Sequence, residues 1–175
     1  MQVIDSHPLG LTRSGLTMVV WGLALIVAGV LSQWASLPYP TGMVVLWGAA
    51  TIIGLVFQGL CQVEHQPLNF YVWVGAIGIG WLFTLYVLYV NGSFYPELAP
   101  AWFLLLGVAY VHTGMKIDTR FYVLAGLHFA LAALFELGGR AGVSFLFIYG
   151  PVIFGLLAGI GLVAGAYYAR VSLQR

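Results

Sequence analysis

Charged side chains are scarce in this sequence. Only 6% of its 175 residues are Asp, Glu, Lys or Arg, whereas soluble domains carry about a quarter. A soluble fold of this size needs a polar surface that so few charges cannot supply, and 62% of the residues are hydrophobic. Lipid is the solvent that tolerates such a surface. The composition therefore predicts an all-α integral membrane protein whose first partner is the lipid bilayer.

The features of several other protein classes are missing as well. The net charge of +1 and the lack of a basic run exclude a nucleic-acid partner. The single cysteine, Cys61, excludes an intramolecular disulfide. No metal or nucleotide motif and no nucleophile elbow occurs. The acidic residues all fall in loops or at helix ends: Asp5, Glu64, Glu97, Asp118 and Glu136. Without a catalytic set, we predict a non-enzymatic protein with no cofactor.

Six apolar stretches have the length that a bilayer requires, roughly 20 residues per helix. They are Ser14–Ser32, Thr41–Cys61, Leu68–Val90, Leu98–Gly114, Phe121–Leu137 and Val143–Ala169. The turn-rich loops between them are too short to hold another domain, so we predict a single six-helix transmembrane domain over residues 1–175. Gly150-Pro151 in the last stretch predicts a kink, or a short interfacial piece before a helix that starts at Pro151.

The basic residues support the count of six. With six crossings, one side receives Arg13, Lys116, Arg120, Arg170 and Arg175, and the other receives only Arg140. The positive-inside rule then predicts that both termini are cytoplasmic and that the chain lies in the plasma (inner) membrane. Aromatic residues near the helix ends, Trp73 and Trp102 among them, are interpreted as ordinary interface anchors.

A weak internal repeat accompanies this pattern. The sequence "FYVWVG" begins at Phe70 and "FYVLAG" at Phe121, and each even-numbered stretch has a proline at its outer start. These matches suggest three repeated helical hairpins. The alternative is a chance match within a reduced, apolar alphabet.

Glycines at helical spacing predict close packing of the helices. The last stretch holds Gly155-x-x-x-Gly159 and Gly161-x-x-x-Gly165, which lie on nearly opposite faces at 100° per residue. A helix with two glycine faces fits between two neighbours. The third stretch adds Gly75 and Gly78. We interpret these glycines as packing or homodimer contacts, with a substrate-passage hinge as the alternative.

His128 is the most notable polar residue within the membrane. It lies about 10 Å from the inner end of its helix, at 1.5 Å per residue. Ala125 and Ala132 share its face, so the face is expected to point at another helix. A buried imidazole needs a hydrogen-bond partner, and Tyr110, at similar depth, is the first candidate, followed by Thr51. A neutral structural role is favoured, and a proton or ligand site is the alternative.

Two further ligand sets were weighed. His112 is the only other membrane histidine, but it lies nearer the inner surface than His128, so the two form a poor axial pair for haem. Cys61, Glu64 and His65, even with His7 and Asp5 added, match zinc-site spacing poorly, and a solvated loop is favoured. At the outer side, Glu136 and Arg140 are spaced for a local ion pair, and with Glu97 they could line a polar patch.

The leading functional hypothesis is an accessory, scaffolding or self-associating subunit of a membrane assembly, either as a homo-oligomer or in a larger complex. It follows from the glycine faces, the short loops and the uncharged core. The alternative is a small-solute or proton transporter or channel with a polar site around His128. A haem-binding redox subunit using His112 and His128 is the lesser alternative.

An even number of crossings leaves both ends of the chain on one side of the membrane. We expect reporters fused to the two termini to be active in the same compartment, the cytoplasm, as measured by compartment-dependent activity of a fluorescent protein and a phosphatase. Activity of the two reporters on opposite sides would contradict the six-helix count and the orientation drawn from it.

Overall fold

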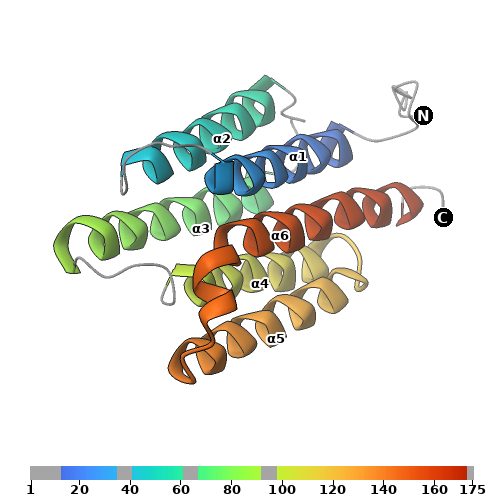
Figure 1. The fold of residues 1–175 in the computed structure, drawn as a ribbon. Helices are drawn as coiled ribbons and strands as arrows, with labels where there is room; N and C mark the ends of the chain where they lie inside the picture. The colour runs from blue at the N-terminus through green and yellow to red at the C-terminus, as the bar shows by residue number, and fades with distance from the viewer. Residues whose placement is uncertain (1–12, 35–40, 61–66, 92–97, 173–175) are drawn as a thin grey trace, which may run out of the picture.

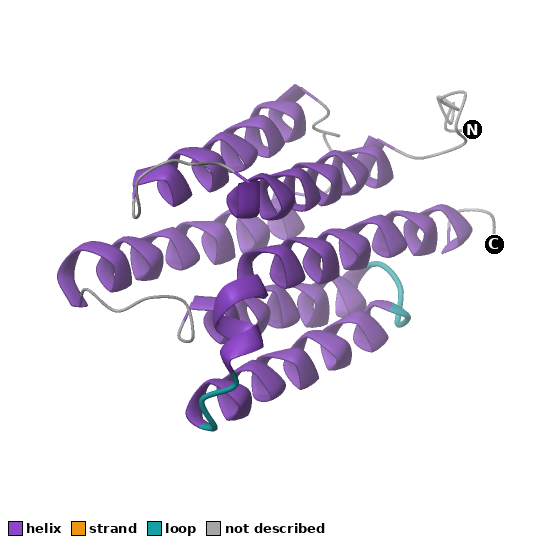
Figure 2. Cartoon of the chain, viewed as in Figure 1, coloured by secondary structure: helices purple, strands orange, loops and turns teal. Residues whose placement is uncertain are grey.

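The computed structural model describes residues 13–34, 41–60, 67–91 and 98–172, which are helical almost throughout and contain no strand (Figure 2). The helices are α1 (Arg13–Trp34), α2 (Thr41–Leu60), α3 (Pro67–Leu85), which continues as a π-helical turn η1 (Tyr86–Asn91), α4 (Leu98–Lys116), α5 (Phe121–Arg140) and α6 (Ser144–Ser172). Five helices are long and apolar enough to cross a membrane, and α2 contains a shorter apolar stretch, Val44–Leu60. The predicted all-α class is thereby confirmed, and the five long apolar helices are consistent with a multi-pass membrane protein.

The helices alternate in direction along the bundle (Figure 1). The beginning of α1 and the end of α6 lie at the same end of it. The contact between α1 and α6 is the most extensive in the structure, followed by that between α4 and α5. α2 packs on α1, and α3 packs on α4. The tightest contacts thus join different predicted hairpins, so the structure does not single out three equal hairpin units.

α6 bends near its start. Figure 1 shows that its first turns, drawn in orange, run at a steep angle to the remainder of the helix. Pro151 lies inside α6, where proline removes a backbone hydrogen bond and its ring crowds the preceding turn. Because the helix begins at Ser144 and continues through Pro151, the structure has a kink rather than a separate interfacial piece.

Glycines bring the backbones of α1 and α6 into contact. A Cβ added at Gly155 would lie 2.5 Å from the carbonyl oxygen of Leu25, and one added at Gly159 would lie 2.5 Å from that of Gly22. The other pair lies elsewhere: Gly161 faces His128 of α5, and Gly165 contacts Met18 of α1 as well as α5. α6 therefore packs against α1 on one side and α5 on the other.

Tryptophan side chains link neighbouring helices by hydrogen bonds. Five indole N–H groups donate across helix pairs: Trp21 to Gln58 (3.1 Å), Trp47 to Ser32 (3.0 Å), Trp73 to Thr113 (3.1 Å), Trp81 to Thr51 (2.9 Å) and Trp102 to Thr84 (2.9 Å). Each accepting hydroxyl in turn donates to the carbonyl four residues earlier in its own helix. The indoles and hydroxyls thus satisfy one another inside the bundle.

Two of these tryptophans differ from the sequence interpretation. Trp73 and Trp102, taken there as interface anchors, are half-buried and donate to Thr113 of α4 and Thr84 of α3. The physical reason is that a buried indole needs an acceptor, and a threonine on the facing helix supplies one. Gly80 makes room for the Trp102 ring, because a Cβ there would lie 2.6 Å from it.

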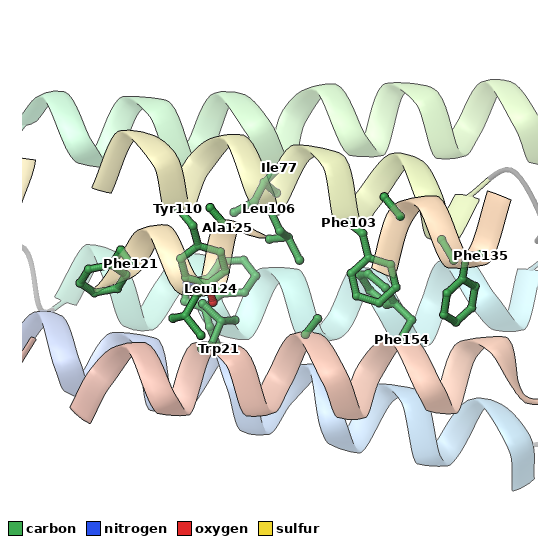
Figure 3. Packing of buried hydrophobic residues seen from close by; sticks show 14 residues of the cluster. Trp21, Ile77, Phe103, Leu106, Tyr110, Phe121, Leu124, Ala125, Phe135 and Phe154 are labelled. Atoms are coloured by element: carbon green, nitrogen blue, oxygen red, sulfur yellow. The ribbon is translucent and has the colours of Figure 1, made fainter. Parts of the chain in front are cut away.

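Aromatic rings fill the space among α2, α4, α5 and α6. The Phe154 ring is 5.5 Å from that of Trp47, 6.5 Å from that of Trp102 and 4.9 Å from that of Phe103, measured between centroids. Figure 3 shows Phe103, Phe154 and Phe135 grouped in one part of the core, with Tyr110, Leu124 and Ala125 in another. The second group contains Tyr110, one of the two residues of the site described next.

The α1–α6 contact generates a stability prediction. Gly159→Ala is expected to lower the free energy of unfolding by about 1–3 kcal/mol, because the added methyl would overlap backbone, which cannot move aside easily. Reversible unfolding in detergent micelles measures the loss.

The matched control is Gly126→Ala on α5, where no described atom lies within 4 Å of the added Cβ. That variant should be neutral or slightly stabilising, since alanine favours the helix. An equal loss in both variants would contradict a close α1–α6 contact.

Candidate functional site

Tyr110 and His128 form the candidate site where α4, α5 and α6 meet. Their rings are 4.9 Å apart between centroids, at an interplanar angle of 54°. Tyr110 is 0% and His128 2% exposed, and Ala125 and Ala132 on the histidine face are also buried. Figure 3 shows Tyr110 of α4 close to Leu124 and Ala125 of α5. The small alanines let α5 approach its neighbours around the imidazole.

The hydrogen bond of His128 goes to its own helix. Nδ1 lies 2.8 Å from the carbonyl oxygen of Leu124. A carbonyl only accepts, so Nδ1 carries the proton and donates it. An imidazolium buried in hydrocarbon would need an anionic partner, and the described carboxylates, Asp118 and Glu136, belong to pairs with Arg120 and Arg140. The ring is therefore neutral, with Nε2 as an acceptor.

Aromatic groups surround the pair. Phe103 lies 5.7 Å from His128, Trp73 meets Tyr110 edge-on at 5.2 Å, and Phe121 stacks on Tyr110 at 6.2 Å, all between ring centroids. These contacts fix the orientation of both rings. On α6, the atoms nearest to a Cβ added at Gly161 would be His128 Cε1, His128 Nε2 and Tyr110 Oη.

Two polar atoms of the site have no hydrogen-bond partner within the described chain: Tyr110 Oη and His128 Nε2. Both border Gly161, since a Cβ placed there would lie 3.6 Å from Tyr110 Oη and 3.5 Å from His128 Nε2. The hydroxyl can donate and accept, whereas the nitrogen can only accept. The arrangement suits a small hydrogen-bonding molecule better than acid–base chemistry on a charged substrate.

Tyr110 and Thr51, the two predicted hydrogen-bond partners of His128, lie in different parts of the bundle. The structure brings Tyr110 beside His128, but without a direct hydrogen bond between them. Thr51 is not part of the site, because its hydroxyl accepts from Trp81 and donates to the carbonyl of Trp47. Thr51 belongs to α2, which packs against α1 rather than α5.

His112 does not join the site. It is half-buried and lies two residues beyond Tyr110 on α4. Two residues turn an α-helix through about 200°, so His112 leaves α4 on the side opposite Tyr110. This geometry does not favour a haem held between His112 and His128.

Of the remaining predicted polar residues, Glu136 and Arg140 are described, and they form a separate pair at the end of α5. Arg140 Nε is 2.7 Å from Glu136 Oε1 in an exposed pair. Their predicted neighbour Glu97, and the loop residues Cys61, Glu64 and His65, lie outside the described residues. Within the described ranges, no group of three His, Cys, Asp or Glu side chains is placed to hold a metal.

The connection between α4 and α5 carries its own charge pair. The Arg120 guanidinium lies 2.8 Å from Asp118 and 5.6 Å from the centre of the Tyr168 ring of α6. The hydrogen bonds that the guanidinium donates to the Asp118 carboxylate raise the pKa of Arg120 above its ordinary value. The pair ties this loop to the end of α6, at the same end of the bundle as the beginning of α1.

Sequence reasoning missed the part that Gly161 plays in the site. It identified the glycine as a packing residue without identifying what the glycine faces. The sequence contained one signal, which is that Gly161 lies on the face of α6 opposite Gly155 and Gly159. Because Gly155 and Gly159 pack on α1, Gly161 faces α4 and α5.

Comparison with known proteins gives no assignment, since no protein-family model, curated protein or solved structure matches this chain.

Proposed function

We propose that this chain is a six-span protein of the plasma (inner) membrane, with cytoplasmic termini, that acts as a non-enzymatic, self-associating subunit. The orientation is supported by charge. α1 begins at Arg13 and the α4–α5 connection holds Arg120, both at the end of the bundle where α6 finishes. Arg140, at the far end of α5, is the basic residue of the opposite end. Such an imbalance places the richer end in the cytoplasm.

Two exposed rows, each built around small residues, carry the proposal of self-association. The row on α3 consists of Gly75, Gly78, Leu82 and Leu85, and the row on α5 of Gly126, Ala130, Ala133 and Leu137. Their alternating spacing of four and three residues follows one helix face. No described atom lies within 4 Å of a Cβ added at Gly75, Gly78 or Gly126.

Exposed glycines in mid-helix call for an explanation. Glycine lowers helix stability by about 1 kcal/mol relative to alanine, and it offers lipid no side chain to contact. Small residues at this spacing serve where a second helix backbone approaches closely. By contrast, Gly155, Gly159, Gly161 and Gly165 are already in contact within the chain. The unused rows on α3 and α5 therefore fit a neighbouring molecule.

A second copy of the chain is the partner that we propose. It presents the same rows at the same depth in the bilayer, so a two-fold interface forms with matched heights. The rows contain no charge, which suits a contact made within the hydrocarbon region.

Gly78→Leu and Gly126→Leu test the two rows. At least one substitution is expected to weaken association about tenfold, equivalent to about 1.4 kcal/mol, because a bulky side chain holds the backbones apart. Energy transfer between labelled chains in liposomes, measured over a range of protein-to-lipid ratios, gives the association constant.

Gly59→Leu is the matched control. Gly59 is exposed and also has no neighbour at its Cβ position, but it lies among large side chains, Ile52, Leu55 and Val56, on α2. Its substitution should leave association unchanged. A wild-type chain that remains monomeric at every ratio, or rows that tolerate both substitutions, would refute the proposal.

A transporter or channel for protons or small solutes is the second candidate. Its support is the pair of unpartnered polar atoms, Tyr110 Oη and His128 Nε2, in the core. If a pathway passes this site, His128→Phe should abolish flux in proteoliposomes, whereas a purely structural histidine predicts only a modest loss of stability. Flux equal to that of empty vesicles for the wild-type chain would dismiss this candidate.

A further inference from the structure

Most buried polar side chains that the structure describes are hydrogen-bonded, but two buried atoms are not. Indoles and hydroxyls pair across the helices: Thr113 accepts from Trp73 and donates to the carbonyl of Ala109. Tyr110 Oη and His128 Nε2, in the same region, have no hydrogen-bond partner in the described chain. Leaving two such groups unpaired in hydrocarbon is strongly unfavourable, so a partner from outside the chain is needed.

The two atoms have complementary chemistry. His128 commits its Nδ1 proton to the carbonyl of Leu124, 2.8 Å away, and Nε2 is left as an acceptor. Tyr110 Oη has one proton to donate and lone pairs to accept. A molecule placed between them must donate to Nε2 and can accept from the hydroxyl. A molecule with both capacities satisfies both atoms, whereas an anion that carries no proton cannot donate to Nε2.

Gly161 lies against both polar ring ends. A Cβ at that position would lie 3.5 Å from His128 Nε2 and 3.6 Å from Tyr110 Oη, and only 2.8 Å from His128 Cε1. Glycine therefore lets the imidazole pack against α6 at a point that is close to both unpartnered atoms. We infer that Tyr110, His128 and Gly161 form a binding site for one small, uncharged hydrogen-bonding molecule, and that water occupies it as a bridge between Oη and Nε2.

Burial decides in favour of water, the smallest molecule with both capacities. Tyr110 is 0% and His128 2% exposed, and the rings of Phe103, Trp73 and Phe121 contact the pair. Buried waters typically make two to four hydrogen bonds to groups that would otherwise be unpaired, and this site offers two. The bridge joins α4, α5 and α6 and does not depend on self-association.

Solid-state NMR of the histidine-labelled, full-length chain in lipid vesicles tests the inference. Polarisation transfer from water to His128 Nε2, assigned by its loss in His128→Leu, is expected in the wild-type chain. Gly161→Ala should abolish the transfer, because its methyl would lie 2.8 Å from His128 Cε1 and would push the imidazole away from the position beside Tyr110. Gly59→Ala, on the exposed face of α2 and outside the site, should leave the transfer unchanged.

Tyr110→Phe provides the second arm, since it removes one oxygen and keeps the ring, and it remains informative if Gly161→Ala does not fold. The water then loses one of its two partners, so transfer should weaken and the Nε2 resonance should shift. Three results would overturn the inference: an Nε2 without a hydrogen bond; an Nε2 bonded directly to Tyr110, with no water transfer; or a signal that Tyr110→Phe leaves unchanged.

Discussion

The structure depends on backbone contact between α1 and α6. In lipid, burial of apolar surface gives no net drive for helices to associate, so close packing has to supply the attraction. Gly155 and Gly159 allow α6 to touch the carbonyl groups of α1 directly. Since α1 and α6 are far apart in sequence, this contact closes the bundle and gives α6 a central position. Its other face, with Gly161, is thereby turned towards α4 and α5, which sets the position of the polar pair.

Polar groups add a second constraint to this packing. Each accepting hydroxyl, Ser32, Thr51, Thr84 and Thr113, bonds to its own helix while it accepts an indole from the next. Beside Thr84, Gly80 lies one turn earlier and makes room for the arriving Trp102 ring. Hydrogen bonds of this kind contribute about 0.6 kcal/mol on average within membranes, so their value lies as much in fixing which helix faces meet. Helices α2 and α3, whose backbones approach little, are joined in this way through Trp81 and Thr51.

Helix extents and depths could be predicted from the sequence, whereas the neighbours of each helix could not. Hydropathy placed the helix boundaries within a few residues, because lipid imposes a length on each apolar stretch. Counting residues from the helix ends correctly predicted that Tyr110 lies beside His128, since α4 and α5 are consecutive and antiparallel. The same arithmetic proposed Thr51, which has a suitable depth but belongs to a helix that packs on α1. Trp73 and Trp102 were assigned to the interface for a related reason: distance along the helix is readable from sequence, but the direction in which a ring points depends on which helix lies opposite.

The polar pair departs from the pattern that governs the rest of the core. Elsewhere a tryptophan or hydroxyl finds its partner on a neighbouring helix, so the chain supplies donors and acceptors in matching positions. At Tyr110 and His128 it supplies two polar atoms and, on the third helix, a glycine in place of a side chain that could have met them. Even an alanine there would overlap the imidazole, because its Cβ would lie 2.8 Å from His128 Cε1. Two unpaired polar atoms among described polar groups that are otherwise hydrogen-bonded are a local inconsistency of the kind expected at a functional site. Because the histidine uses its one proton within its own helix, whatever binds there must bring a donor of its own.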